Sequence, residues 1–125
     1  MSPDPAAAVA QVRALCLALP EAAERSSHGA PGFHIEGGRF FAYFWHDHHG
    51  DDETVVIVKT SGAEEQAMLI DMDPDCYFKP AYLGPSGWIA MRLDRPDTDW
   101  DQVGDRIAIS WELIAPRRLL EAGGR

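Results

Sequence analysis

The first apolar positions of the chain recur at the spacing of an α-helix. This stripe consists of Val9, Val12, Leu15, Cys16 and Leu19. Asp4 is a suitable N-cap, and Pro5 suits the first helical position. Because a helix usually stops before a proline, the pattern predicts a first helix that ends ahead of Pro20.

The next part of the chain predicts a loop followed by three strands. Ser, Gly and Pro residues punctuate residues 20–32, which are predicted to be a loop. Alternating apolar and polar positions predict a strand at 33–36, a turn at Gly37-Gly38 and a return strand at 39–45. A polar loop at 46–53 precedes a third strand at 54–59, which is rich in β-branched residues.

The second half of the chain predicts two more helices and two more strands. Ser61-Gly62-Ala63-Glu64 matches a capping box, so a helix is predicted to start there and to end near Asp71. Strands are predicted at 76–78 and 88–93, and Thr98 is the predicted cap of the last helix. The apolar stripe of that helix is Trp100, Val103, Ile107, Trp111 and Ile114. Pro116 either ends this helix or begins a short extra turn through Leu120.

The order of these elements predicts the fold class. Sequential strands joined by short turns favour an antiparallel sheet of about five strands. Helices packed on one face of that sheet make a two-layer α+β domain. We expect residues 1–125 to form one such domain, because 125 residues suffice for a single core.

Charge and cysteine content narrow the setting in which the protein acts. The chain has 20 acidic and 11 basic residues and a net charge of −9, which repels polyanions on average. Its N-terminus lacks a basic segment followed by an apolar run, so we expect no signal peptide. The apolar runs are too short to span a bilayer, so we expect no membrane partner. Cys16 and Cys76 are expected to be free thiols in a reducing cytoplasm.

Aromatic and basic residues fall together on one predicted face of the sheet. Alternation along the strand at 39–45 places Phe40, Ala42 and Phe44 on one side. It places Phe41 on the other side, together with several residues of a candidate binding surface. The members of that surface are Arg39, Tyr43, Trp45, Lys59, Trp88 and Arg92.

Rings beside cations are what single-stranded nucleic acid needs, since each stacked base contributes about 1–3 kcal/mol. The alternative is that these rings belong to the core and that the Lys and Arg heads simply reach solvent.

Two loops near the ends of the sheet extend the candidate surface. The loop at 46–53 is acidic and repels phosphate, whereas the loop at 79–87 carries Lys79 and Tyr82. The tract His46-Asp47-His48-His49 contains metal-binding residue types, but neighbours on one loop converge poorly, so no metal is expected. Cys76 is expected to be a structural thiol, and we predict no cofactor and no catalytic residue.

Several segments in order resemble one family of small bacterial proteins. They are Leu17-Ala18-Leu19-Pro20-Glu21-Ala22, His28-Gly29-Ala30-Pro31-Gly32-Phe33, Arg39-Phe40-Phe41-Ala42, Val58-Lys59, Tyr82-Leu83-Gly84-Pro85-Ser86-Gly87-Trp88-Ile89, Asp99-Trp100-Asp101 and Ala115-Pro116-Arg117-Arg118-Leu119. Together they resemble the MmcQ/YjbR family over about residues 10–120. The resemblance implies a CyaY-like α+β fold and non-catalytic DNA binding through a "double-wing" arrangement. A protein-interaction or small-ligand module that uses the same aromatic face is the alternative function.

Overall fold

The computed structural model describes residues 4–47, 50 and 52–121. The elements in chain order are α1 (Pro5–Leu17), β1 (Ala22–Ser27), β2 (Ala30–Ile35), β3 (Phe40–His46), β4 (Thr54–Lys59), α2 (Ala63–Met72), β5 (Tyr77–Phe78), the 3₁₀ turn η1 (Gly84–Ser86), β6 (Trp88–Arg92), α3 (Trp100–Ile114) and α4 (Arg117–Glu121). All paired strands are antiparallel, in the order β1-β2-β3-β4-β6-β5.

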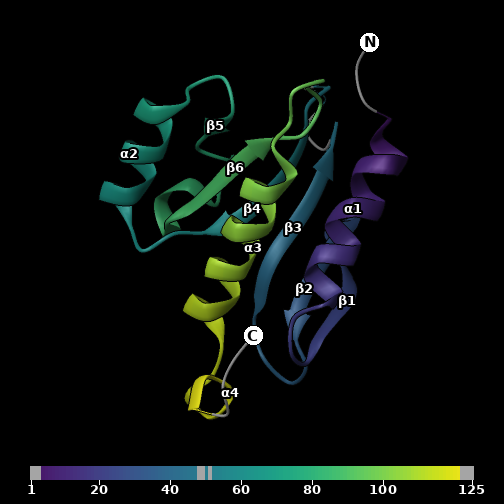
Figure 1. The fold of residues 1–125 in the computed structure, drawn as a ribbon, viewed down its shortest axis with the longest axis vertical. Coiled ribbons are helices and arrows are strands. Elements are labelled where there is room, and N and C mark those ends of the chain that lie inside the picture. Colours follow the sequence, from purple (N-terminus) through teal and green to yellow (C-terminus); the bar gives the residue numbers. More distant parts are fainter. Residues whose placement is uncertain (1–3, 48–49, 51, 122–125) are drawn as a thin grey trace.

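The main core lies between this sheet and helices α1 and α3. Both helices lie over the same face of the sheet, with α1 across β1 and β2 and α3 across β3 and β4 (Figure 1). Val12 of α1, Trp111 of α3 and Ile89 of β6 are fully buried within this core. The predicted α+β fold is therefore confirmed, with six strands where about five were expected.

The predicted loop at 20–32 is wrong, because it forms the extra strand β1 and the start of β2. The two strands pair from Ala22↔Ile35 to Ser27↔Ala30 and turn at His28-Gly29, where both residues have positive φ. β1 is an edge strand whose central residues are exposed, so its sequence lacks the apolar alternation that marks a half-buried strand.

A β-bulge changes the predicted faces of the strand at 39–45. Phe33 pairs with Ala42 and His34 pairs with Phe40, which leaves Phe41 as the extra residue of β3. The Phe41 ring is buried in the main core, whereas Phe40 stacks on Tyr43 on the opposite face. The prediction for Phe40 and Phe41 is therefore wrong, because simple alternation does not account for an inserted residue.

Two predicted helix caps are displaced by one residue. Asp99 caps α3 by accepting the N–H groups of Asp101 and Gln102, while the Thr98 hydroxyl donates to the Arg95 carbonyl. Gly62 is the N-cap of α2 without a side-chain hydrogen bond.

The prediction for α1 is confirmed, with Asp4 as its N-cap and Pro5 as its first residue. Of the two alternatives for Pro116, the short extra turn is confirmed as α4.

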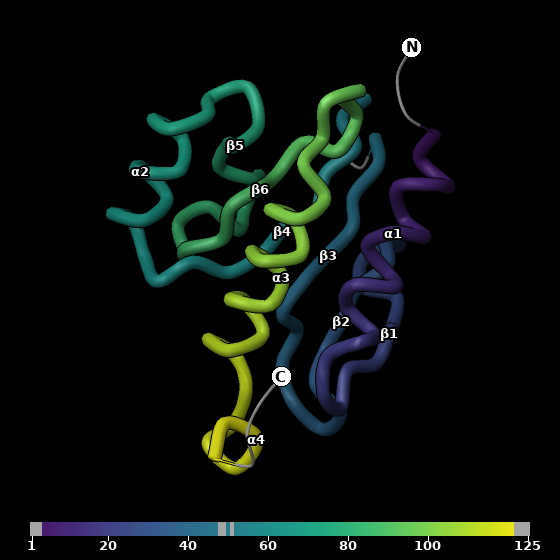
Figure 2. Tube along the Cα trace, viewed as in Figure 1, coloured from purple at the N-terminus to yellow at the C-terminus, as the bar shows by residue number. Residues whose placement is uncertain are grey.

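A second, smaller apolar cluster lies on the face of the sheet away from α1 and α3. Its buried members are Val55, Ile57, Trp88 and Ala90, and the partly buried residues packed on them are Tyr43, Trp45, Phe78 and Leu83. The chain between β5 and β6 curls back beside β6 (Figure 2). Gln66 of α2 fixes this segment by donating to the carbonyls of Gly84, at 2.8 Å, and Trp88, at 2.7 Å.

Candidate ligand-binding groove

The cations and rings of the second face converge on one groove. The groove has a volume of about 460 Å³, and its lining residues are Arg25, Gly38, Arg39, Phe40, Tyr43, Lys59, Ser86, Trp88 and Ile114. These residues come from β1, the turn before β3, β3 itself, β4, η1, β6 and α3. Positions that are far apart in the sequence therefore meet at the end of the sheet where β3 begins and β4 ends.

The groove lies where β3 and β4 separate. Their pairing reaches Ala42↔Val58, and the Ser110 hydroxyl of α3 then bridges the strands. It accepts the Lys59 N–H at 2.8 Å and donates to the Phe41 carbonyl at 2.5 Å. Ile114, one turn further along α3, belongs to the main core and also lines the groove. The groove therefore extends from the open face of the sheet toward the helix layer.

Three aromatic rings form a row across the groove with a cation at each end. The Arg25 guanidinium lies 4.8 Å from the centroid of the Phe40 ring, which lies 5.1 Å from that of Tyr43 at an interplanar angle of 28°. The Tyr43 and Trp88 centroids are 5.3 Å apart, and the Lys59 ammonium lies 5.8 Å from the Trp88 centroid. Each such contact contributes about 0.5–1.5 kcal/mol, so the rings hold one another in place without a ligand.

The groove is positively charged, although the whole chain is acidic. Its described lining has three cationic side chains, Arg25, Arg39 and Lys59, and no carboxylate. Within the described part of the chain, none of these three forms an ion pair, and the Lys59 ammonium donates to the Ser86 carbonyl. Burial raises the pKa of the Tyr43 phenol, and the Arg25 charge acts in the opposite direction. The lining can therefore attract an anion and stack or hydrogen-bond a ring.

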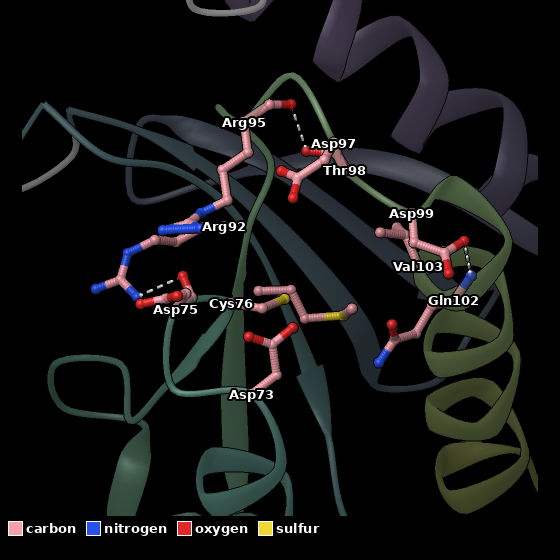
Figure 3. A pocket seen from close by; sticks show the side chains of 11 residues that line it. Asp73, Asp75, Cys76, Arg92, Arg95, Asp97, Thr98, Asp99, Gln102 and Val103 are labelled. Carbon is pink, nitrogen blue, oxygen red and sulfur yellow. Dashed lines mark hydrogen bonds between the residues drawn. The ribbon is translucent and has the colours of Figure 1, made fainter.

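A second recess, of about 130 Å³, lies between the β5–β6 edge and the start of α3. Figure 3 shows Arg92 and Arg95 on one side of this recess and Gln102 on the other, with Asp73 and Cys76 between them. Burial, and then the Asp73 charge, raise the pKa of the Cys76 thiol, although Arg95 and Arg92 partly offset them. A protonated thiol is a poor nucleophile, which agrees with the predicted structural role.

Comparisons with known proteins place the chain in a family. The YjbR family model matches residues 17–113. The chain belongs to the YjbR family. The sequence resemblance to the MmcQ/YjbR family is thereby confirmed.

A solved structure has a fold similar to that of this chain. The crystal structure of the Deinococcus radiodurans protein DR2400, a DUF419 domain, is similar to this YjbR-family chain with a TM-score of 0.70 and 19% identity. The similarity covers 92% of this chain and 87% of that one. No curated protein matches.

Four of the eight predicted site residues of this YjbR-family protein line the groove. They are Arg39, Tyr43, Lys59 and Trp88. Trp88 is 9% exposed, so most of its ring packs in the second cluster and only part of it borders the groove. Trp88 lies on the predicted face, but most of its ring is covered because Leu83, in the segment between β5 and β6, packs on the same cluster.

Arg92 and Trp45 lie on the predicted face but not in the groove. Arg92 donates to the Glu53 carboxylate at 3.0 Å and to the Asp75 carbonyl at 3.1 Å, and its guanidinium lies 4.4 Å from the Phe78 ring. Because Glu53 neutralises Arg92, this residue is a weaker partner for phosphate than the groove cations. Trp45 packs against the second cluster near the same end of the sheet.

Lys79 and Tyr82 are exposed on the segment between β5 and β6, outside the groove. This segment does not project as a wing, because Leu83 packs on the second cluster and Gly84 is buried. The other predicted wing, at 46–53, includes His48, His49 and Asp51, which lie outside the described residues.

Sequence reasoning missed Arg25 and Phe40. Arg25 lies on the strand that was predicted to be a loop, and Phe40 was assigned to the wrong face. The sequence did contain a signal for the strand that carries Arg25. His28-Gly29 form a tight turn directly after Ser27, the last residue of β1. The bulge had no comparable signal in the sequence.

The described residues show neither a metal site nor a helix that could cross a membrane. Within residues 4–47, 50 and 52–121, no group of His, Cys, Asp and Glu side chains is placed to hold a metal ion. The predicted histidine tract lies partly outside these residues, and His46 is hydrogen-bonded to the Thr54 hydroxyl at 2.8 Å. Over the same residues, no helix has both the length and the apolar character that a bilayer crossing requires.

Proposed function

We propose that this YjbR-family protein binds single-stranded nucleic acid at the groove without catalysing a reaction. One observation carries the proposal: the groove joins three cations that lack acidic partners among the described residues with a row of three aromatic rings. Cations attract the phosphates, and partly exposed rings offer apolar surface to the bases.

The charge distribution favours a single strand over a duplex. A duplex presents phosphates along a rigid surface and demands many cations spread over the contacting face. Here the net charge is −9, and Arg92, the next cation on this face, is held by Glu53. A flexible single strand can instead bring its phosphate to the groove and turn its unpaired base toward the rings.

Binding without chemistry is the simplest function of this lining. Acid–base and nucleophilic catalysis use His, Asp, Glu and Cys most often, and also Lys and Tyr, usually with a second activating group beside them. The groove lining has no His, Cys, Asp or Glu among the described residues, so Lys59 and Tyr43 have no carboxylate or imidazole beside them in the lining. The free thiols of Cys16 and Cys76 support the proposal that the protein works in the reducing cytoplasm.

The second candidate function is a small-ligand module. A volume of about 460 Å³ lies within the range of about 300–1,000 Å³ that small-molecule sites occupy. The two candidates predict different dependence of the Kd on ligand length: a small-ligand module binds a free small molecule and gains nothing from an attached strand.

Fluorescence anisotropy with labelled oligodeoxythymidylate tests the proposal. Three groove cations predict that log Kd changes with log salt with a slope of at most about 2 in magnitude. We expect Arg39→Gln to weaken binding about 10-fold, the scale of one charge-assisted contact. Lys79→Gln, which removes the same charge outside the groove, serves as the matched control and is expected to change Kd less than about 2-fold. Absence of binding in low salt, or equal effects of the two variants, would contradict the proposal.

A further inference from the structure

The groove is too small for a strand that stacks many bases. Its volume of about 460 Å³ is that of a site for one small ligand. Proteins that bind long single strands provide extended surfaces and accommodate about 4–16 nucleotides per domain. The ligand unit that this groove accommodates is therefore short.

Ile114 favours contact with one planar group. Because β3 and β4 separate beyond Ala42↔Val58, the groove reaches this residue of α3. Its aliphatic side chain provides an apolar surface, which suits a base and disfavours a charged phosphate. The cations Arg25 and Arg39 are exposed and belong to the outer part of the molecule. The lining therefore has an apolar inner end and a cationic outer end.

The ring row leaves little room for continuous stacking along the sheet. Phe40 and Tyr43 stack on each other, and Trp88 is 9% exposed. Since the rings already cover parts of one another, a base can contact the row at the groove but cannot intercalate successively along it. One bound base per groove satisfies this geometry.

The cation Arg92 at the opposite end of the same face is already held in an ion pair. Glu53 and Arg92 lie beside the first residues of β4, while the groove lies at its last residue, Lys59. The strand between them spans about 17 Å at 3.3 Å per residue. Glu53 pairs with Arg92 at that far end, while Asp73 and Asp75 line the recess between the β5–β6 edge and the start of α3. A strand that continued across the face would therefore meet a cation that a carboxylate already holds.

We propose that the groove is a one-nucleotide site: it binds a single unpaired base with its attached phosphate, the base toward Ile114 and the phosphate at Arg25 and Arg39. This inference rests on the proposed function and narrows its ligand. The same chemistry is present in a free nucleoside monophosphate and in an unpaired nucleotide of a strand.

Calorimetric titration of the whole protein separates these sources. The probes are thymidine, thymidine 5′-monophosphate, and oligodeoxythymidylates of two, four and twelve residues. We expect the monophosphate to bind about 10-fold more tightly than thymidine, because only it engages the cations. A longer strand offers more nucleotides that can occupy the groove, so the Kd is corrected for the number of nucleotides in the strand. We expect this corrected Kd to change less than about 3-fold from the dinucleotide to the twelve-mer. Steadily tighter binding up to the twelve-mer would overturn the one-nucleotide site while leaving single-strand binding intact.

Two variants test the placement of the ligand. Arg25→Gln is expected to weaken monophosphate binding about 10-fold and leave thymidine binding within about 2-fold, whereas Lys79→Gln changes neither. Ile114→Val keeps the core apolar, and we expect it to alter binding of thymidine and of its monophosphate by the same factor.

The outcomes distinguish the two proposals. Binding of the monophosphate but of no oligonucleotide supports the one-nucleotide site, with the free nucleotide as its source, and overturns the proposed function. If no probe binds to a protein that remains folded by circular dichroism, both proposals fail.

Discussion

The charge of Arg25 and the phenol of Tyr43 are coupled across the groove. Arg25 lies over Phe40, and Phe40 stacks on Tyr43, so all three occupy one side of the groove. Burial raises the pKa of Tyr43, while the nearby guanidinium favours the phenolate and so limits the rise. The protonation behaviour of a single tyrosine therefore reports on the position of the cation that we assign to phosphate binding.

Removing the Arg25 charge should raise the pKa of Tyr43 further. In Arg25→Gln the phenolate loses a favourable neighbour, while its burial is retained. Titration of ¹³Cζ-labelled tyrosines by NMR measures this shift, and Tyr82, which is 86% exposed and outside the groove, is the internal reference. A lower or unchanged Tyr43 pKa in the variant would contradict this placement of Arg25.

At the scale of elements, α3 both covers the sheet and defines the groove. Ser110 of α3 takes the place of the next ladder bonds between β3 and β4 by bonding to Lys59 and Phe41. Ile114 follows on the same helix and lines the opening. The helix therefore holds the two strands apart at one end and fills part of the space behind them.

Ser110→Ala should destabilise the protein by about 2 kcal/mol, because it leaves the part-buried Lys59 N–H and the buried Phe41 C=O without their partner. Urea unfolding measures this loss as a lower midpoint at an unchanged slope. The matched control is Ser26→Ala on the exposed edge strand β1, which should stay within about 0.5 kcal/mol of the parent. A Ser110→Ala midpoint equal to that of the control would mean that the bridge contributes little.

Some elements could be predicted from the sequence and others could not. The strand at 54–59 and the start of α1 were predicted correctly, because β-branched runs and an Asp-Pro cap act locally. β1 was missed, since an edge strand with exposed residues has no apolar alternation. The candidate site was half predicted. Alternation placed Tyr43 and Lys59 on one face of the sheet, but it could not show that Glu53 pairs with Arg92, because these two residues are far apart in the chain.

For the whole molecule, the net charge and the groove charge have opposite signs. The chain carries −9, while the groove lining, among the residues that the structure describes, carries three cations and no carboxylate. Five ion pairs occur among the described residues, and most of them are exposed, so they contribute little to stability. Salt should therefore affect stability by screening the repulsion between acidic side chains, and it should affect binding by screening the groove cations.

Added salt should stabilise the fold while it weakens nucleic-acid binding. Raising NaCl from about 0.02 to 0.2 M at pH 7 screens the net charge of −9, and we expect Tm to rise by a few degrees. Over the same range, the anisotropy titration should give a higher Kd. At about pH 5, where partial protonation reduces the net charge, the rise in Tm should shrink. A fall in Tm at pH 7 would show that the ion pairs outweigh the repulsion.

The inserted residue in β3 has a consequence for how relatives of this chain are compared. Phe40 and Phe41 are chemically the same, yet Phe40 lines the groove and Phe41 lies inside the protein, because Phe41 has no partner on β2. An alignment that runs through this strand without a gap would equate groove positions with interior ones in any relative that lacks the insertion. Residue 40 of this chain should then be compared by its cross-strand neighbour, His34, and not by its place in the sequence.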